Sequence, residues 1–430
     1  MTVRQRIHWL ALHGVIRNLA ALGARRGDLQ ARLIADPRAR ANPGEFADEL
    51  RQKGRMFRGR AAWLTADHDV VHQLLRSDDF SVTAIGMNLP APLRWVEQRT
   101  RVAGRMHPLL PPSLLAVEPP DHTRYRKTVS SVFTVRAVAA LRERVQLAAT
   151  SLIDDLDADG HSVDVVQRYC SQLPITVIGD ILGVPEGERT KILEYGELAA
   201  PSLDVGLSWS QHLNVEKGLA DFTAWLTGHI ARLRASPGDD LMSQLIDASD
   251  EGTRLDDGEL LATAGLVLAA GFETTVNLLG SGIRLLLNHP DQLALLLDEP
   301  ERWPLAVEEI LRLESPVQLT ARYARVDTDV VGHPVKAGDA VVLYLAGANR
   351  DPEVFADPHR FDVTRENAGR HLSFSGGRHF CLGAALARAE GEVGLRTFFE
   401  RHPAARSAGA GARRDTRVLR GWATLPVALS

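Results

Sequence analysis

A single cysteine placed between glycines, directly before a long helix, is the feature that most constrains this chain. Residues 374–383 read Phe-Ser-Gly-Gly-Arg-His-Phe-Cys-Leu-Gly, and an alanine-rich helical run from Ala384 to Glu400 follows. A thiolate at a helix N-terminus is stabilised by the helix macrodipole and by unpaired backbone N–H groups. Gly377 can adopt a positive φ, and Gly383 allows a flat ligand to lie against the backbone. This setting suits Cys381 as a cysteine that stays ionised in order to bind iron as an axial ligand.

The rest of the composition excludes several other classes of protein. The second cysteine, Cys170, lies in an apolar stretch and is interpreted as a small buried side chain. Two cysteines exclude a disulfide framework, and neither CxxC nor HExxH occurs, so the sequence shows no structural zinc site. A formal net charge of −4 over 430 residues gives no reason to expect nucleic acid as a partner. Because no linker, repeat or charge run divides the chain, we expect residues 1–430 to form one domain, and nothing demands more than a monomer.

The N-terminal residues bear on location. They show no apolar core followed by a small-residue cleavage site, so we expect no secretory signal peptide and a cytoplasmic protein. Residues 1–30 form a basic amphipathic segment in which five arginines precede the first acidic residue, Asp28. A basic amphipathic helix can lie on an anionic membrane, but it more often packs its apolar face on its own domain. We therefore expect membrane contact to be peripheral at most.

Helical periodicity dominates the chain, and strand signals are few. We expect helices over 68–77, 121–132, 136–157, 166–183, 186–198, 211–234, 240–248, 256–288, 290–297, 303–314 and 382–401. We expect strands over 60–65, 321–324, 340–345, 417–419 and 426–429. Residues 80–120 are rich in proline and show no clear period, so we expect a long loop that covers a binding pocket as a lid. The expected fold class is mostly α with a small β portion (α+β).

Polar residues interrupt the longest apolar helix near its middle. Residues 268–275 read Leu-Ala-Ala-Gly-Phe-Glu-Thr-Thr, and burying an acid and two hydroxyls opposes stability unless they are paired. Gly271 weakens the helix by about 1 kcal/mol relative to alanine. Thr274 can donate a hydrogen bond to the carbonyl of Ala270, which opens the helix and forms a groove. Such local conflicts often mark functional sites, and this groove is a suitable seat for dioxygen.

Together these two motifs resemble those of the cytochrome P450 family. Phe374, Gly377, Cys381 and Gly383 match the heme-binding loop F-x-x-G-x-x-x-C-x-G, although Ser375 replaces a frequent glycine. Residues 270–275 resemble the family motif A-G-x-[DE]-T-[TS]. The likeness is closest to soluble bacterial, actinobacterial-type members and covers essentially the whole chain.

The resemblance implies heme b as the cofactor and O2 as the co-substrate. It implies a fold in which a long central helix lies over the heme and the thiolate loop lies beneath it. Cys381 would bind the heme iron, Glu273 would belong to the proton relay, and Thr274 would position oxygen and its water. The remaining residues implied to surround the heme in these two motifs are Ala270, Gly271, Phe374, Gly377 and Gly383.

Two further groups of residues follow from the resemblance. Glu309 and Arg312 stand three apart on one helix face and resemble the family's ExxR motif. The resemblance implies a buried pair, completed by Arg360 of the P-x-R-F segment 358–361, that holds the thiolate loop in place. The residues implied to bind the heme propionates are His122 and Arg126 of the segment 121–126, Arg322, and His379.

The implied substrate and partners come from what surrounds the heme and from what the chain lacks. Pocket walls implied by the resemblance are apolar and predict a medium-sized lipophilic substrate; they are Leu268, Ala269, Val317, Leu319, Trp422 and the lid. The sequence has no dinucleotide-binding GxGxxG after a strand and no room for a flavin or iron–sulfur domain. Reducing equivalents must therefore come from other proteins, which by resemblance are a ferredoxin and its NAD(P)H-dependent reductase.

The sequence thus predicts a heme-thiolate monooxygenase that hydroxylates or epoxidises its substrate. One alternative is a peroxide-driven hydroxylase on the same fold, which would not need the acid–threonine pair Glu273–Thr274. Another is a heme-binding sensor or carrier without turnover, which would need neither that pair nor a long lid. No residue in the sequence selects the substrate or the position that is oxidised.

Overall fold

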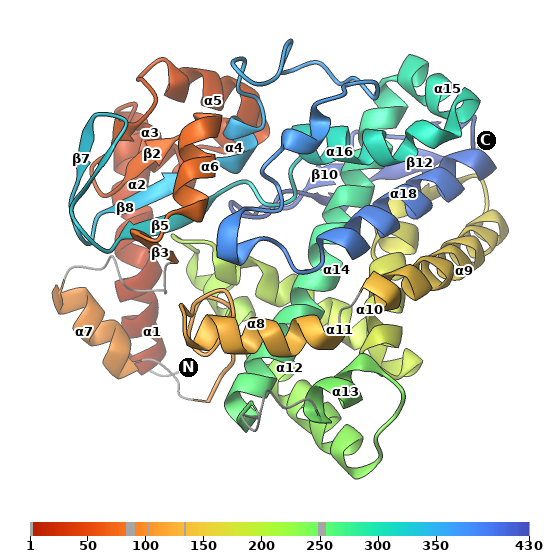
Figure 1. The fold of residues 1–430 in the computed structure, drawn as a ribbon, viewed down its shortest axis with the longest axis horizontal. Helices are drawn as coiled ribbons and strands as arrows, with labels where there is room; N and C mark the ends of the chain where they lie inside the picture. Colours follow the sequence, from red (N-terminus) through yellow and green to blue (C-terminus); the bar gives the residue numbers. More distant parts are fainter. Residues whose placement is uncertain (1–2, 83–90, 101–103, 133–134, 248–254, 430) are drawn as a thin grey trace.

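The longest helix, α14 (Asp257–Asn288), runs through the middle of the protein, and other helices pack around it (Figure 1). The computed structural model describes residues 3–82, 91–100, 104–132, 135–247 and 255–429. Helix α14 begins at a capping box in which Asp256 and Glu259 each accept a hydrogen bond from the other's backbone N–H. Within the described residues it is the one helix long and apolar enough to cross a membrane, but 67% of its most apolar window is buried, as in a core helix.

The helices fall into three groups along the chain. The first group comprises α1 (Val3–Trp9), the π-helical turn η1 (Leu10–Gly14), α2 (Val15–Arg25), α3 (Leu29–Ala35), α4 (Pro37–Ala41), α5 (Pro43–Arg51), α6 (His68–Arg76) and α7 (Ala91–Thr100). The second comprises α8 (Asp121–Val132), α9 (Val135–Asp159), η2 (Val166–Cys170), α10 (Gln172–Ile181), α11 (Glu186–Ala199), η3 (Ala200–Leu203), α12 (Trp209–Ala235) and α13 (Leu241–Asp247). After α14 come α15 (Pro290–Asp298), η4 (Pro300–Arg302), α16 (Trp303–Leu313), α17 (Leu345–Ala348), η5 (Ala368–Arg370), η6 (Gly377–His379) and α18 (Ala384–Arg401).

The strands form one five-stranded sheet and three smaller ones. The larger sheet has the order β1-β2-β8-β5-β3 and contains β1 (Phe57–Arg58), β2 (Trp63–Thr65), β3 (Phe80–Val82), β5 (Thr320–Ala324) and β8 (Ala340–Leu343). Strands β2 and β8 are parallel, with Leu64 opposite Val342, and the other pairs in this sheet are antiparallel. The smaller sheets pair β4 (Ser162–Asp164) and β9 (Arg406–Ser407) with β12 (Pro426–Ala428), β6 (Thr328–Val330) with β7 (His333–Val335), and β10 (Ala412–Arg413) with β11 (Trp422–Thr424).

Figure 1 shows the larger sheet with α5 and α6 on one side of α14 and α9, α15 and α18 on the other. The main hydrophobic core lies between α14, α10, α16 and α18, where Phe272, Trp303 and Phe398 are almost completely buried. A smaller core lies between the sheet and α6. Because α14 and α18 share the main core, the motifs predicted to hold dioxygen and iron are carried by two helices that pack together.

The expected mostly helical class with a small β portion is confirmed, and the helices expected from 68–77 onward are present with shifts of a few residues at their ends. Two expectations were wrong. Residues 91–100 of the expected lid loop form helix α7, and residues 417–419 form only an isolated bridge between Leu419 and Val317. The three short helices α3 to α5, for which there was no expectation from the sequence, are additional elements. The parts of the lid at 83–90 and 101–103 lie outside the described residues.

Candidate active site

The thiolate loop is closed by a backbone hydrogen bond and by contact with α6. The Cys381 N–H donates to the Phe374 carbonyl at 2.9 Å, which folds the loop back on itself just before α18. Gly377 has a φ of +62°, and a Cβ at this position would lie 2.5 Å from the Leu75 carbonyl oxygen. Only glycine fits both the backbone conformation and this close approach. The loop glycine predicted from the sequence is therefore required by the packing of the loop on α6.

Ser375, which replaces a frequent glycine of the family motif, and Gly383, the last glycine of the motif, differ in backbone conformation. Ser375 also has a φ of +62°, a conformation that costs a residue with a side chain about 1 kcal/mol. Gly383 has an ordinary φ of −84°, so its backbone does not require glycine. No heavy atom lies within 4 Å of the position that a Gly383 Cβ would occupy. The space beside Gly383 is open, as expected if a flat ligand lies there.

The protein surroundings of Cys381 disfavour a free thiolate. Cys381 is exposed to solvent, but burial of its thiol among the surrounding protein atoms raises the pKa of the thiol. The Gly383 N–H, Arg126 and Arg388 act in the opposite direction and do not overcome this burial. The helix end therefore does not by itself keep Cys381 ionised. A coordinated metal ion does so directly, because it replaces the thiol proton.

Four basic side chains gather near the thiolate loop; Glu118 lies 3.9 Å from His379 but pairs more closely with Arg378, at 2.9 Å. The His122 and His379 rings lie 4.3 Å apart, and the Nε2 atom of each is buried without a hydrogen-bond partner. Arg322 is buried and hydrogen-bonds only within its own strand, and no ion pair to Arg322 or Arg126 is found among the described residues. Burial, together with these neighbours, lowers the pKa of His379 to about 3, and burial lowers the pKa of Arg322 to about 10. Such a cluster fits a ligand with two carboxylates, as a heme has.

The predicted groove on α14 has the expected hydrogen bond. The Thr274 hydroxyl donates to the Ala270 carbonyl at 2.8 Å, in place of a side chain that points freely into solvent. Ala270 is exposed and Gly271 and Thr274 are half-buried, although they lie in the middle of the core helix. Ala270 and Thr274 therefore line an opening on this mostly buried helix, whereas a Cβ at Gly271 would lie 3.1 Å from Ile178 of α10.

Glu273 turns away from this opening toward the C-terminal tail. Its carboxylate is buried and accepts a hydrogen bond from Arg414 Nη1 at 2.9 Å. Arg414 Nη2 also contacts Glu197 at 3.3 Å, and the Glu197 side chain is 61% exposed. Burial raises the pKa of Glu273, an effect that Arg414 opposes and Glu197 reinforces. Two successive ion pairs thus connect the buried acid with the protein surface.

The buried Glu309–Arg312 pair is present, but its third member differs from the prediction. Arg312 donates two hydrogen bonds to Glu309, at 2.6 and 2.8 Å, and both side chains are fully buried. Arg365 Nε donates to Glu309 at 3.2 Å and completes the cluster. The assignment of Arg360 was wrong, because this segment turns the Arg360 carbonyl toward Arg312 and leaves the Arg360 side chain exposed. Arginines near this segment give no sequence signal that would distinguish Arg365.

The residues expected to form the pocket wall do not all lie on an open surface. Leu268 is completely buried in the main core, so the prediction that it lines the pocket was wrong. Ala269, Val317 and Leu319 are half-buried and pack at the edges of three different core clusters. These three residues remain predictions for the pocket wall.

Trp422 was also misassigned as a pocket residue. The Arg413 guanidinium lies 3.8 Å from the centre of its ring, and the Arg284 guanidinium lies 5.6 Å away. Another edge of the ring faces Gly280 of α14. Trp422 is 8% exposed, because these contacts already cover its ring. Its place is structural, between the tail and the central helix.

One acidic residue was overlooked by sequence reasoning. Glu390 of α18 is 1% exposed and contacts the Thr275 hydroxyl at 3.4 Å, while its Oε1 atom has no hydrogen-bond partner. Burial raises the pKa of Glu390 well above its ordinary value, which indicates a neutral acid. Charged residues are spaced along α18 on both sides of Glu390, as on an exposed helix face, so the sequence did not indicate that Glu390 is buried. No three His, Cys, Asp or Glu side chains come close enough in the described part of the chain to hold a metal ion by themselves.

Comparisons with known proteins agree with this geometry. Residues 304–404 match the family model described as Cytochrome P450. The chain is 65% identical to cytochrome P450 140 of Mycobacterium tuberculosis and Mycobacterium bovis, over 99% of this chain and 98% of the relative. It is 40% identical to 6-deoxyerythronolide B hydroxylase of Saccharopolyspora erythraea, over 87% of this chain and 91% of that protein.

A solved structure resembles the whole fold. P450BioI in complex with hexadec-9Z-enoic acid ligated acyl carrier protein superimposes with a TM-score of 0.81 and 30% identity, covering 91% of this chain and 99% of that one. The shared sequence, the fold and the fit of the basic cluster around Cys381 lead to one conclusion. The chain belongs to the cytochrome P450 family of monooxygenases, oxidoreductases that use heme b as cofactor and O2 as co-substrate.

Proposed function

We propose that this protein inserts one atom of O2 into a C–H or C=C bond of a medium-sized lipophilic substrate. Electrons would come from a separate ferredoxin and its NAD(P)H-dependent reductase. The observation that carries the proposal is the arrangement on α14, where an opening formed by Ala270 and Thr274 adjoins a buried acid that is linked to the surface. A peroxide-driven hydroxylase or a heme carrier would not need an acid with this connection.

Each residue has a distinct role in this proposal. Heme bound through Cys381 supplies the activation of O2. The Thr274 hydroxyl, held by the Ala270 carbonyl, orients oxygen and an accompanying water in the opening. Arg414 stays protonated and holds the Glu273 carboxylate; when the Glu273 side chain turns from Arg414 it would take up a proton from water and pass it toward the opening. His122 and His379, with Arg126 and Arg322, would hold the heme carboxylates.

The substrate class rests on the apolar surroundings and on the relatives. The names of the compared proteins include a hydroxylase of 6-deoxyerythronolide B and a protein bound to a fatty acyl chain. Both ligands are lipophilic, which agrees with the half-buried apolar residues Ala269, Val317 and Leu319. We also propose that residues 1–430 act as one catalytic domain, monomeric and in the cytoplasm.

The first test is the absorption spectrum of the dithionite-reduced protein with and without carbon monoxide. A strongly red-shifted Soret band in the native protein, lost in Cys381→Ser, is the expected result. A band at shorter wavelength in the native protein would contradict thiolate ligation by Cys381. Turnover with ferredoxin, reductase and NAD(P)H should exceed turnover with hydrogen peroxide alone, and the opposite order would favour the peroxide-driven alternative.

A further inference from the structure

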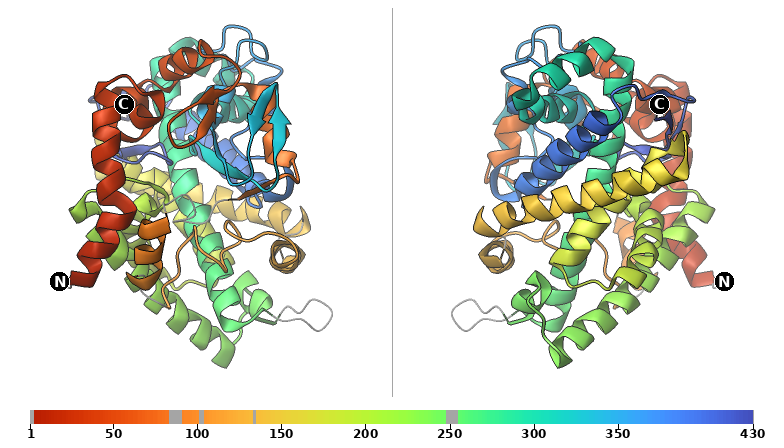
Figure 2. Two further views of the ribbon diagram at one scale, coloured as in Figure 1. Left: turned by 90° about the vertical axis from the view of Figure 1, so that its left-hand side faces the viewer. Right: turned by 90° about the vertical axis from the view of Figure 1, so that its right-hand side faces the viewer.

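The continuous helical segment α1–η1–α2, residues 3–25 and here called the N-terminal helix, presents a row of large apolar side chains to solvent. The residues of this row, here called the outer stripe, are Val3 (76% exposed), Ile7 (44%), Leu10 (50%), Leu19 (63%) and Leu22 (51%). In the left view of Figure 2 this helix, in red, runs along one edge of the molecule. The sequence led us to expect that such a helix buries its apolar residues on its own domain. The outer stripe shows that many of them remain uncovered.

The π-helical turn η1 (Leu10–Gly14) brings the two halves of the stripe into line. In an unbroken α-helix, Leu22 would lie about 120° around the axis from Leu10. A π turn absorbs one extra residue, which reduces this angle to about 20°. The same shift moves Leu19 from the side opposite Leu10 to within about 80° of it. Without this turn, Leu19 and Leu22 would not continue the row that Ile7 and Leu10 begin.

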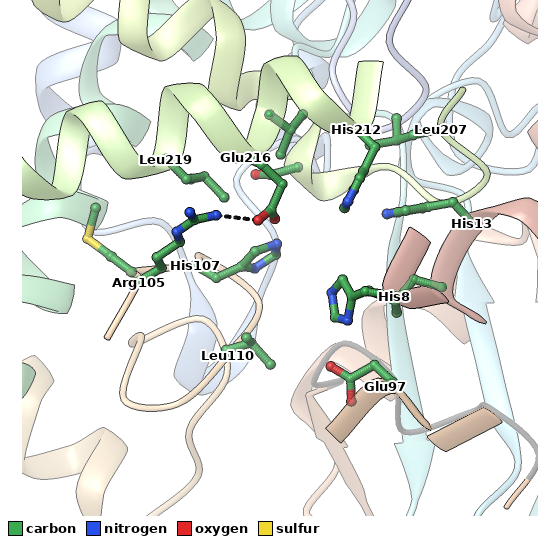
Figure 3. A pocket seen from close by; sticks show the side chains of 14 residues that line it. His8, His13, Glu97, Arg105, His107, Leu110, Leu207, His212, Glu216 and Leu219 are labelled. Atoms are coloured by element: carbon green, nitrogen blue, oxygen red, sulfur yellow. Dashed lines mark hydrogen bonds and ion pairs between the residues drawn. The ribbon is translucent and has the colours of Figure 1, made fainter. Parts of the chain in front are cut away.

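The face turned toward the protein is partly polar, which reverses the usual arrangement of a surface helix. His13 is buried, and its ring lies 5.4 Å from that of His212 on α12. The His8 ring lies 6.0 Å from His212 and its Nδ1 atom is 3.0 Å from the Thr100 hydroxyl. Figure 3 shows His8, His13 and His212 lining one pocket between the N-terminal helix and α12. His13 therefore faces inward while the leucines of the outer stripe face outward.

The helix is held in this orientation by specific hydrogen bonds. Trp9 Nε1 donates to the Leu207 carbonyl at 3.0 Å, in the segment that leads into α12. Arg4 Nε donates to the Thr100 carbonyl at 3.2 Å, at the end of α7. Ala11 and Leu12 are buried beneath these contacts. The outer stripe is consequently fixed in place, and turning it inward would break these bonds.

The charge around the stripe selects what can cover it. All charged side chains before Asp28 are arginines, and Arg6, Arg25 and Arg26 are exposed. A second copy of this chain would bring the same arginines against the stripe, so like charges would oppose self-association. An anionic lipid surface offers both an apolar layer for the leucines and negative head groups for the arginines.

We propose that the outer stripe docks on the surface of an anionic lipid bilayer, with the helix lying in the plane of the interface. The helix contacts α7 and the segment at Leu207, so docking would bring the border of the expected lid close to lipid. A lipophilic substrate dissolved in the membrane would then reach the lid directly; this second point, unlike the docking itself, rests on the proposed function.

The test is co-sedimentation of the full-length holoprotein with vesicles that contain phosphatidylglycerol and phosphatidylcholine. We expect Leu19→Gln/Leu22→Gln to lower the partition coefficient about tenfold. The matched control is Leu147→Gln/Val326→Gln, which changes two side chains that are 66% and 48% exposed elsewhere, and it should bind as the native protein does. Binding should also weaken on pure phosphatidylcholine and in 0.5 M salt.

Three outcomes would overturn the proposal: no binding of the native protein, equal loss in the stripe and control variants, or undiminished binding of the stripe variant. A dimer in sedimentation velocity that the stripe variant dissolves would also overturn it, by assigning the stripe to a second copy. An unchanged heme absorption spectrum in each variant shows that it is folded. Because the readout is vesicle binding, an absence of monooxygenase turnover would refute the proposed function and leave the docking result intact.

Discussion

Glu273 of the central helix and Arg414 of the C-terminal tail form a 2.9 Å ion pair across 141 residues of sequence. Both side chains are shielded from solvent, at 7% and 12% exposure. The pair fixes the tail against α14 and holds the acid beside, but not in, the opening at Thr274. It also determines how strongly Glu273 resists protonation, because Arg414 opposes the rise in its pKa caused by burial.

Removing Arg414 should therefore destabilise the fold. In Arg414→Ala the Glu273 carboxylate stays buried without its cation, and we expect the free energy of unfolding to fall by about 3 kcal/mol. Adding Glu273→Gln removes the unpaired charge and should restore part of that loss. Urea unfolding of the two single variants and the double variant measures this coupling. Strictly additive effects would show that the ion pair contributes nothing.

The hydroxyl of Thr274 should govern how electrons are used. In Thr274→Ala we expect NAD(P)H oxidation to continue while product per NAD(P)H falls about tenfold or more and hydrogen peroxide accumulates. Thr274→Ser keeps the hydroxyl that bonds Ala270 and should remain coupled. The measurement is the ratio of product and peroxide to NAD(P)H consumed. Unchanged coupling in the alanine variant would remove Thr274 from the oxygen site.

The corrected arginine cluster predicts a contrast between two neighbouring positions. Arg365→Ala leaves the fully buried Glu309 with one cation fewer and should lower the free energy of unfolding by about 3 kcal/mol. Arg360→Ala should change it by less than about 0.5 kcal/mol, because only the Arg360 carbonyl enters the cluster. Thermal unfolding and heme retention measure both. A larger loss for Arg360→Ala than for Arg365→Ala would reinstate the assignment made from the sequence.

Glu390 should make stability depend on pH. Burial raises its pKa in the folded protein, so the carboxyl stays neutral there but ionises in the unfolded chain above its ordinary value. The stability contribution is then complete at low pH and declines by about 1.4 kcal/mol per pH unit as pH rises toward the folded pKa. Glu390→Gln cannot ionise and should become more stable than the native protein as pH rises. Parallel pH profiles of the two proteins would show that Glu390 is ionised when folded.

The histidines between the N-terminal helix and α12 predict that packing of this helix weakens as pH falls, opposite to the pH dependence expected for Glu390. Burial is the main cause that lowers the pKa of His13 to about 3 and that of His212 to about 4. The packing of the N-terminal helix on α12 is therefore strongest above pH 6.5. It weakens as pH falls toward these values, by about 2 kcal/mol for each histidine at pH 5. The other titratable or charged groups around these histidines are His8, Glu97, Arg105, His107, Glu216 and Arg417.

Hydrogen exchange of residues 3–25 tests this dependence. Exchange should accelerate between pH 7 and pH 5, after correction for its intrinsic rate, relative to a core segment such as α16. His13→Gln should reduce the dependence, because one of the two groups no longer titrates. Equal protection of the N-terminal helix at both pH values would show that protonation does not affect its packing on the rest of the protein.

Local patterns predicted the framework because they reflect local forces. The capping box at Asp256 and the apolar period that follows mark α14 on their own, and the glycines around Cys381 mark the thiolate loop. Helix α7 escaped prediction because its arginines and single tryptophan form no clear apolar face before the N-terminal helix packs against it. The π turn η1 likewise depends on tertiary contacts, since nothing between Leu10 and Gly14 forbids an ordinary helix.

The parts of the site that were missed join residues far apart in sequence. Glu273 and Thr274 stand out as polar residues in an apolar helix, whereas Arg414 is one of several arginines in a polar tail. Arg365 and Arg360 differ only in which side of a turn each faces. Trp422 was misassigned because an aromatic residue near the end of the chain gives no indication of whether a cation or a ligand covers it.

The position of Arg414 gives the last residues of the chain a role that matters for engineering. The segment that carries Arg414 and Trp422 ends in β12, which is paired with β4 on one side and β9 on the other. If an electron donor were fused after β12, the fusion would therefore have to leave the β10–β11 pair and strand β12 intact. Trimming the tail to shorten such a linkage would remove the counter-charge of the buried acid, and the fused enzyme would be expected to waste its reducing equivalents.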